Sequence, residues 1–344
     1  MDKLIERGGE FLRSVIFENI PKILIALLIL YVGWKLIKLL KKGLKKPLLA
    51  YIYAFLIIIC YIGGFLSIQA NTITKSTIEL FNIDKNIIAL ILSIVVLIII
   101  FGGVKKISNV TSKLVPIMIV LYVATGVFIL IVNYTQIPTV LLKIIRLAFN
   151  FESLKGGLLG TVLLGLQRGI FSNEAGMGTG SIASSIVDSN ESAKQGYLQM
   201  LGVYITTMLI CTSTAIIILT SDYQSIHLLD INGIEITQYA FKYHLGNLGN
   251  IIVFLSIVMF AFSTILTGYY YSESSLKFIF KNITSKHTLS LKLLIIAIVF
   301  IGCLTSPSIL WTIVDLLSAF LVIINVYTLL KLRKEIKEEY DKYK

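Results

Sequence analysis

The strongest constraint on this chain is the recurrence of mostly apolar runs of about 20 residues along almost its whole length. A run of that length crosses the hydrocarbon core of a bilayer as an α-helix. The runs are rich in Ile and Leu, are too long for barrel strands and lack period-2 alternation. Of the 344 residues, 56% are hydrophobic and only 15% are charged, which excludes a soluble domain. The sequence therefore predicts an all-α polytopic membrane protein.

We predict about nine transmembrane spans, one of them interrupted. The first has no small-residue cleavage site behind it and is therefore expected to be a retained helix rather than a signal peptide. The spans are predicted at residues 21–40, 48–69, 86–104, 113–133, 157–187, 195–221, 248–280, 290–305 and 309–331.

The basic residues indicate how the spans are oriented. The net charge is +12, but Lys and Arg cluster in the loops between spans, as the positive-inside rule describes, and form no stripe for nucleic acid. If the basic loop after the first span is cytoplasmic and successive loops alternate between the two sides of the membrane, the cytoplasmic side also holds Lys105, Lys106, Lys277, Lys281 and the tail 332–344. We therefore expect a multi-pass protein of the cytoplasmic membrane with a cytoplasmic C-terminus. The cysteines and histidines are scattered, so no metal site is predicted beyond a candidate for Na⁺.

One predicted span contains a polar, glycine-rich segment, "RGIFSNEAGMGTGS", at residues 168–181. At membrane depth every backbone group must be satisfied internally, so irregular backbone persists only inside protein or beside a watery cavity. Glycines permit an unwound turn at little steric cost. We therefore predict a helix broken within 168–181. Asp315 and Asn325 are polar residues inside the last predicted span, so they also need partners or a cavity.

A broken helix presents two ends that suit a zwitterion. Free carbonyls at the end of the first half favour an ammonium or Na⁺, and free N–H groups at the start of the second half favour a carboxylate. Ser172 and Asn173 supply neutral oxygens for a hard cation. The alternative is a glycine-rich helix that only packs tightly, but packing does not explain the charges of Arg168 and Glu174.

The motif "RGIFSNEAGMG", followed by "QGYLQMLGVYITTMLICTSTAIIIL" at 195–219, resembles the alanine or glycine:cation symporters, the sodium:alanine symporter family. The segments "SIQANTI" (67–73), "GGVKKISNVTSKLVP" (102–116), "FAFSTIL" (260–266) and "YYSE" (270–273) agree, and the resemblance covers roughly residues 45–330. It implies a leucine-transporter-like fold of two inverted five-helix repeats, with substrate at the midplane and the span 157–187 as the broken sixth helix.

The resemblance also implies site residues. The unwound substrate segment would run from Phe171 to Gly178 and include Ser172, Asn173, Glu174 and Gly176. Gln69 and Asn71 would line the pocket or its approach, as would Thr264 and Gly268. Asn173, Ser263 and Thr264 would bind the coupling ion, Na⁺, with no further cofactor, although adjacent hydroxyls often only bond back to a carbonyl one turn earlier.

The N-terminal part departs from the family pattern. The family's Gly-Thr-Gly-Asn segment and Gly-Gly…Phe-Trp-Met-Trp stretch have no counterpart here. Residues 19–46 instead weakly resemble the first helix of small-conductance mechanosensitive channels. We therefore expect a divergent N-terminal helix and basic loop (1–46), a symporter-like core (47–331) and a charged tail (332–344), which together make an incomplete inverted-repeat fold.

Two expectations follow for the site. Without a facing first core helix, Arg168 and Glu174 would be under-satisfied or would pair with each other. Where the family has a Trp, this chain has Gly268, which predicts a roomier pocket.

The predicted function is sodium-coupled symport of a small neutral amino acid, with no enzymatic activity. The alternative is a truncated or recombined symporter-derived membrane protein that does not transport.

Overall fold

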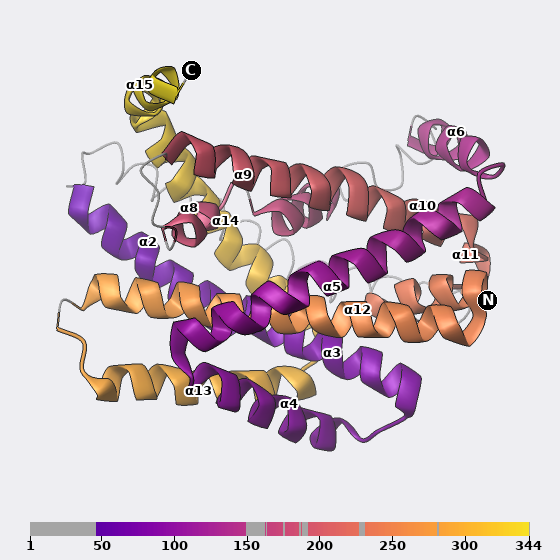
Figure 1. Ribbon diagram of the computed structural model, residues 1–344, viewed down its shortest axis with the longest axis horizontal. Helices are drawn as coiled ribbons and strands as arrows, with labels where there is room; N and C mark the ends of the chain where they lie inside the picture. The colour runs from indigo at the N-terminus through magenta and orange to yellow at the C-terminus, as the bar shows by residue number, and fades with distance from the viewer. Residues whose placement is uncertain are drawn as a thin grey trace, which may run out of the picture.

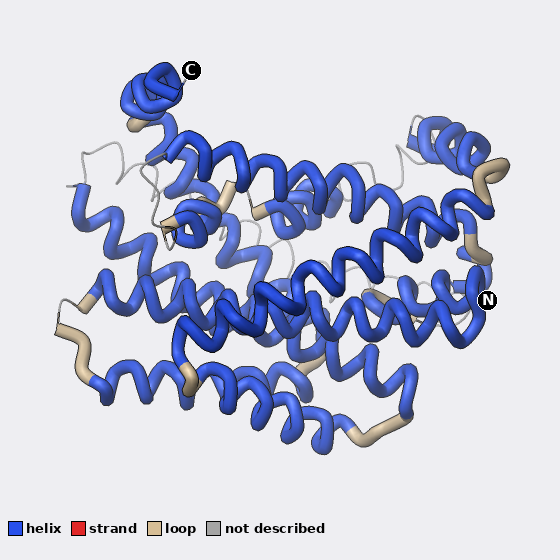
Figure 2. Tube along the Cα trace, viewed as in Figure 1, coloured by secondary structure: helices blue, strands red, loops and turns tan. Residues whose placement is uncertain are grey.

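The computed structural model describes residues 46–148, 162, 164–174, 176–185, 187, 192–226, 231–280 and 282–343. In this part of the chain, every regular element is helical (Figures 1 and 2). The elements are α2 (Lys46–Cys60), η1 (Tyr61–Phe65), α3 (Leu66–Phe81), α4 (Lys85–Ile100), α5 (Gly103–Val132), α6 (Ile137–Ala148), α8 (Thr179–Ser184), α9 (Ser192–Tyr204), η2 (Ile205–Cys211), α10 (Thr212–Thr220), α11 (Tyr223–Ile226), α12 (Ile234–Ile279), α13 (Ser285–Leu304), α14 (Pro307–Lys331) and α15 (Arg333–Tyr343).

Six of the described helices are long and apolar enough to cross a membrane. They confirm the all-α, polytopic class. The spans are Leu48–Phe81, Gly103–Val132, Ala193–Thr220, Ile234–Ile279, Ser285–Leu304 and Pro307–Lys331, and α4 is a shorter apolar helix. The predicted span 21–40 lies outside the described residues, and the interrupted span 157–187 is described only in part.

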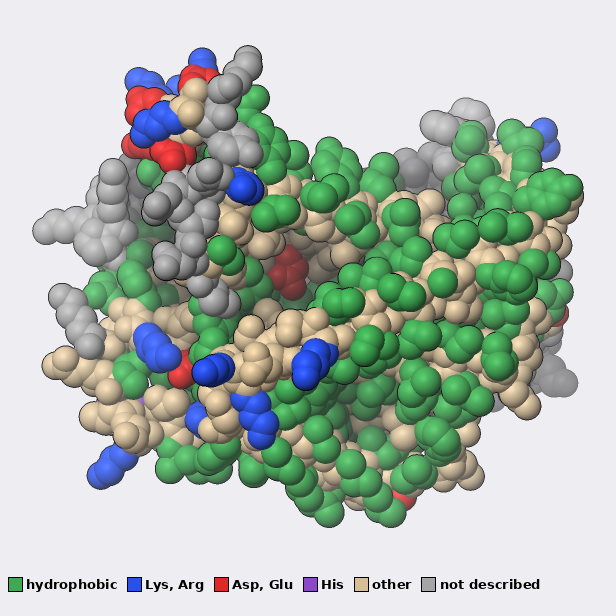
Figure 3. All heavy atoms as spheres, in the orientation of Figure 1, with side chains coloured by type: hydrophobic (Ala, Val, Ile, Leu, Met, Phe, Trp, Pro, Cys, Tyr) green, Lys and Arg blue, Asp and Glu red, His purple; other side chains and the backbone are tan. Residues whose placement is uncertain are grey.

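The surface of the bundle is largely apolar, as a lipid-facing surface requires. Large hydrophobic side chains are exposed along most of the long helices, and they dominate the face in Figure 3. On that face, Lys and Arg side chains gather where α5 begins and α12 ends (Figure 3).

The long helix α12 is the central element of the fold. It crosses the molecule in Figure 1 and packs most extensively against α3 and then against α5. Its conformation is interrupted at Gly246, where φ is 62° and ψ is −150°, so it consists of two helical parts. The main hydrophobic core lies among α2, η1, α3, α4, α12, α13 and α14, and a second cluster joins α5, α10 and α12.

The first part of α12 corrects one prediction. The predicted spans 195–221 and 248–280 leave a loop over 221–248, but residues 234–245 are helical. Phe241 and Ala240 are fully buried in the second hydrophobic cluster, and Ile234 and Leu245 pack at its edge. Apolar residues at 234, 241 and 245 have helical spacing, so the pattern was present but too short to predict a span.

Close packing around η1 depends on glycines. A Cβ on Gly64 would lie 2.5 Å from Cγ2 of Val314, and one on Gly302 would lie 2.7 Å from the Cα of Ser67. Small residues let membrane helices approach closely. These contacts bring α14 and α13 against the continuous helix α2–η1–α3, which carries several of the site residues.

Candidate functional site

The helix that carries the predicted site ends and restarts within five residues. Residues 164–173 are helical, a turn follows at 176–178, and α8 begins at Thr179. Glu174 has a φ of 48° and Gly178 a φ of 84°, both in the left-handed region that few residues other than glycine adopt. The break predicted for 168–181 is therefore present, and its described residues are Glu174 and 176–178.

The carbonyls of the break accept hydrogen bonds from two other helices. The Tyr53 hydroxyl on α2 donates to the carbonyl of Met177 at 2.6 Å. The Asn325 amide on α14 donates to the carbonyl of Gly176 at 3.1 Å. Asn325 thus has the partner that its position in an apolar span required. A Cβ on Gly178 would lie 2.5 Å from Oδ1 of Asn325 and 2.7 Å from the Tyr53 hydroxyl, so this position has no space for a side chain.

Glu174 lies half-buried at the start of the break. Its Oε2 accepts hydrogen bonds from the Tyr61 hydroxyl at 2.9 Å and from Oγ1 of Thr179 at 2.6 Å. Tyr61 and Thr179 are each 1% exposed, so the carboxylate is held by donors that water does not reach. The carboxylate is therefore fixed on one oxygen, with no described residue donating to Oε1.

The expectation that Arg168 and Glu174 pair with each other was wrong. Nη2 of Arg168 lies 2.5 Å from Oδ2 of Asp315 on α14. Side chains six positions apart in a regular helix point about 120° apart around its axis, so these two face different neighbours. Asp315 thereby has its partner, and Glu174 is instead satisfied by Tyr61 and Thr179.

Aromatic side chains connect this ion pair to the break. The Arg168 guanidinium lies 4.0 Å from the ring centroid of Trp311. Trp311 meets Phe171 edge-on at 4.8 Å, and Phe171 stacks on Phe65 at 4.7 Å. Phe65 stacks in turn on Tyr61, the donor to Glu174. Phe171 therefore lies within a continuous aromatic layer beside the unwound segment.

The remaining residues of the segment face several directions. Asn173 is half-buried in the last helical turn before the break, and Gly176 lies against Val322 of α14. Ser172 is exposed, and its hydroxyl contacts the sulfur of Cys211 in η2 at 3.2 Å. The structure thus places Ser172 toward η2, whereas Phe171 contacts η1 and α14.

Gln69 and Asn71 are not brought together, although both are on α3. Asn71 is 8% exposed and donates from Nδ2 to the carbonyl of Thr305 at 2.8 Å, which ties α3 to the turn between α13 and α14. Gln69 is half-buried and two positions away, which is on nearly the opposite face of a helix. Their common role in a pocket therefore remains a prediction.

Ser263 and Thr264 both bond back to their own helix. The two hydroxyls donate to the carbonyl of Phe260 at 2.9 and 3.0 Å. Ser and Thr hydroxyls in helices often bond in this way to a carbonyl one turn earlier without binding any cation. Their role toward Na⁺ also remains a prediction.

Gly268 lies where packing is already tight. A Cβ at this position would lie 2.5 Å from Cδ1 of Leu66 and 2.9 Å from Cδ1 of Tyr61. The expected gain in space from the absent indole is therefore not found beside Gly268, because side chains of α3 and η1 fill it.

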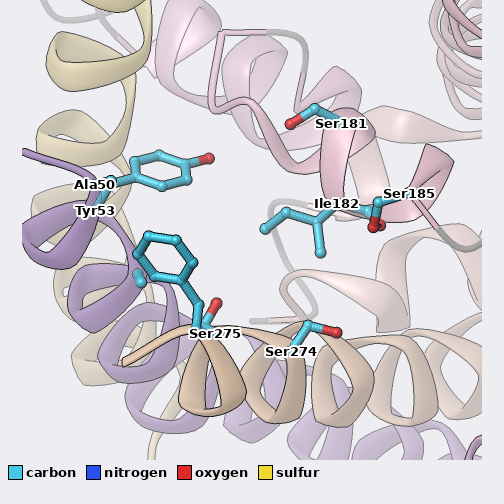
Figure 4. A pocket seen from close by; sticks show the side chains of 9 residues that line it. Ala50, Tyr53, Ser181, Ile182, Ser185, Ser274 and Ser275 are labelled. Atoms are coloured by element: carbon cyan, nitrogen blue, oxygen red, sulfur yellow. The ribbon is translucent and has the colours of Figure 1, made fainter. Parts of the chain in front are cut away.

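Two cavities are each lined by a residue that contacts the broken helix. One, of about 300 Å³, is lined by Tyr53, by Ser181 and Ser185 beyond the break, and by Ser274 and Ser275 of α12 (Figure 4). The other, of about 520 Å³, is lined by residues of α3, the start of α12 and the start of α14, including Asn71 and Trp311. Tyr53 and Trp311 thus each connect one cavity to the contacts that hold the unwound segment.

The sequence did not single out Tyr53, Tyr61, Trp311 or Thr179. Their types are common in membrane spans, and only the fold shows which of them reach the break. Within the described part of the chain, no three His, Cys, Asp or Glu side chains form a group that could hold a metal ion.

Comparison with known proteins identifies the family. Residues 37–344 match the sodium:alanine symporter family. The chain belongs to this family. It is a family of transporters and not of enzymes. Residues 14–51 also match the conserved transmembrane helix of mechanosensitive ion channels, in agreement with the resemblance of residues 19–46.

Curated relatives of the family are similar over most of this chain. It is 35% identical to the amino-acid carrier protein AlsT of Bacillus subtilis, over 88% of this chain and 64% of that protein. It is 35% identical to the probable sodium/glutamine symporter GlnT of the same organism, over 86% and 61%. It is 31% identical to the sodium/alanine symporter AgcS of Methanococcus maripaludis, over 77% and 58%. The chain therefore spans less than two thirds of the length of these relatives.

Proposed function

We propose that this chain is a sodium-coupled symporter of a small neutral amino acid. The observation that carries the proposal is the helix break at 174–178, inside a membrane protein of the sodium:alanine symporter family. Irregular backbone and a carboxylate at such a position are costly in a membrane and are typically retained for a transported ligand. AgcS and GlnT, whose names specify sodium with alanine and with glutamine, support the ion and the substrate class.

Glu174 is the proposed partner of the substrate ammonium. Both described hydrogen bonds to its carboxylate go to Oε2, and no described residue donates to Oε1, so we assign the substrate ammonium to Oε1. Phe171, Ser172 and Asn173 would contact the substrate from the preceding turn, and the backbone at Gly176 and Gly178 would approach it closely. Gln69, Asn71, Thr264 and Gly268 complete the proposed substrate set.

The proposed sodium ligands are Asn173, Ser263 and Thr264. Neutral oxygens are suitable ligands for a hard monovalent cation, and each of the two hydroxyls keeps a lone pair while it donates to Phe260. Coupling would follow because the ion and the substrate stabilise the same closed state, so each raises the affinity of the other.

A small substrate fits the packing better than a large one. Gly178 has no space for an added methyl group, and the neighbourhood of Gly268 is filled by Leu66 and Tyr61. We therefore expect glycine and alanine to be transported in preference to leucine.

The full chain reconstituted in liposomes tests the proposal. An inward Na⁺ gradient should drive uptake of labelled alanine, a K⁺ gradient should not, and Glu174→Gln should abolish the Na⁺-dependent part. The matched control is Glu235→Gln, which removes another partly buried carboxylate that is paired with Lys75. Loss of uptake in both variants alike, or uptake without Na⁺, would contradict the proposed site or the proposed coupling.

One observation favours the alternative of a symporter-derived protein without transport. The carbonyls of Gly176 and Met177 and one oxygen of Glu174 are already satisfied by the chain's own side chains. If those bonds are permanent, folded protein in liposomes would show neither uptake nor alanine binding.

A further inference from the structure

The short helix α6 (Ile137–Ala148) stands apart from the bundle. It follows the end of α5 and has 12 residues, which is too short to cross a bilayer. Figure 1 shows α6 nearly end-on, whereas α5, α9 and α12 are seen largely along their length. The long helices cross the membrane, so α6 lies roughly in the plane of the membrane, near the level at which α5 ends.

The sequence of α6, IPTVLLKIIRLA, is strongly amphipathic. Apolar residues recur at helical spacing and form one continuous face. The residues of this apolar face are Ile137, Val140, Leu141, Ile144, Ile145 and Ala148. Thr139, Lys143 and Arg146 follow one another at spacings of four and three, so they form a polar strip on another side of the helix. The sequence of α6 contains two basic residues and no acidic one.

The rest of the protein holds the polar strip and leaves much of the apolar face open. Lys143 donates to the Tyr223 hydroxyl of α11 and lies 4.6 Å from the centroid of that ring. Leu141 and Ile145, in contrast, are 43% and 56% exposed. A helix at a watery surface turns its apolar face toward protein, so this orientation is the reverse of what water favours.

The surroundings of α6 face lipid as well. The described element with which it makes the most contact is α10. That helix belongs to the span Ala193–Thr220, in whose most apolar stretch only 6% of the residues are buried. In Figure 3 the visible side chains of α6 are mostly apolar and continue the apolar surface of the neighbouring helices. The open face of α6 is therefore continuous with the lipid-facing surface of the bundle.

We propose that α6 is an interfacial helix that binds the phospholipid surface. Leu141 and Ile145 extend into the acyl chains, and the exposed Arg146 faces the headgroup phosphates. Amphipathic helices with a basic polar strip lie in this way, with the apolar face about 5–10 Å into the boundary between headgroups and acyl chains. The positive charge of α6 complements the phosphates. This placement of α6 does not depend on transport.

The full chain in vesicles, with a single tryptophan in α6, tests the proposal. In a Trp34→Phe/Trp311→Phe background, Leu141→Trp places the indole on the apolar face. Thr139→Trp is the matched control on the polar strip, because side chains two positions apart point about 160° apart around a helix axis. The vesicles contain phosphatidylcholine and phosphatidylglycerol in equal parts. Lipid brominated on its acyl chains quenches an indole that contacts those chains, and acrylamide quenches one that contacts water.

The ratio of bromolipid quenching to acrylamide quenching should be about fivefold higher for Leu141→Trp than for Thr139→Trp. Ile145→Trp should behave like Leu141→Trp and replaces it if that variant does not fold. Equal ratios on the two faces would overturn the proposal. An apolar-face indole shielded from both quenchers would also overturn it, because protein, such as a second copy of the chain, would then cover that face.

A charge reversal tests the contact with phosphates. Arg146→Glu in the Leu141→Trp protein should lower bromolipid quenching about twofold in the same vesicles, because anionic headgroups repel a carboxylate. Lys334→Glu, an exposed position on α15, is the matched control and should leave the quenching unchanged. Equal quenching in Arg146→Glu, Lys334→Glu and their parent would overturn the contact of Arg146 with the headgroups.

Discussion

Replacement of Gly178 by Ala should be among the most destabilising small substitutions in the described part of the chain. The residue has a φ of 84°, and a left-handed conformation costs an L-residue with a Cβ about 1–2 kcal/mol. The new Cβ would lie 2.5 Å from Oδ1 of Asn325 and 2.7 Å from the Tyr53 hydroxyl. Both side chains must move, which weakens two hydrogen bonds worth about 1 kcal/mol each.

The expected loss in the free energy of unfolding is therefore about 3 kcal/mol. Equilibrium unfolding in mixed micelles with increasing dodecyl sulfate measures it. Gly103→Ala is the matched control, because Gly103 has a φ of 72° but no atom within 4 Å of the added Cβ. That control should lose only the conformational part, about 1–2 kcal/mol.

Asn325→Ala provides the second half of the experiment. In that background the closest obstacle to a Cβ on residue 178 is gone, so the added cost of Gly178→Ala should fall toward that of Gly103→Ala. Equal losses for Gly178→Ala and Gly103→Ala in the parent would refute the close approach of α2 and α14 to the break.

Two further predictions concern other parts of the fold. Gly302→Ala would place a Cβ 2.7 Å from the Cα of Ser67, so backbone must shift, and overpacking of this kind costs about 1–3 kcal/mol. Gly63→Ala, with no atom within 4 Å, should cost less, and the same unfolding titration compares the two. Asp84 caps α4, and hydrogen bonds from the Asn86 backbone N–H and side chain hold the pKa of Asp84 below its ordinary value. The stabilisation should be full above the ordinary aspartate pKa and be lost as the pH falls through the lowered value, so Asp84→Ala should be less sensitive to acid than the parent.

The sequence predicts which residues belong to the site better than it predicts which residues they contact. The polar segment in an apolar run was sufficient to place a broken helix, because lipid tolerates no other conformation for those residues. Asp315 and Asn325 could be identified as needing partners for the same reason. Which partners they find could not be predicted, since Arg168 and Asp315 are 147 positions apart and meet only through the packing of two segments.

The errors have local physical causes. The helix at 234–245 was missed because its apolar face is short and its remaining residues are polar, so hydropathy alone indicates a loop. The roomier pocket at Gly268 was predicted from a missing indole, but a small residue on a helix lets neighbouring helices pack closer to it. Leu66 and Tyr61 occupy the space.

The π-helical turn η1 sets the angular relation between the two ends of the continuous helix α2–η1–α3. Such a turn contains one residue more than an α-helical turn, which rotates everything beyond it by about 100°. Before it, Tyr53 reaches the carbonyl of Met177, and after it, Asn71 reaches the carbonyl of Thr305. If η1 tightened into an ordinary α-turn, only one of these bonds could form. The extra residue therefore keeps both ends of the helix in register with the break and with the α13–α14 turn at once.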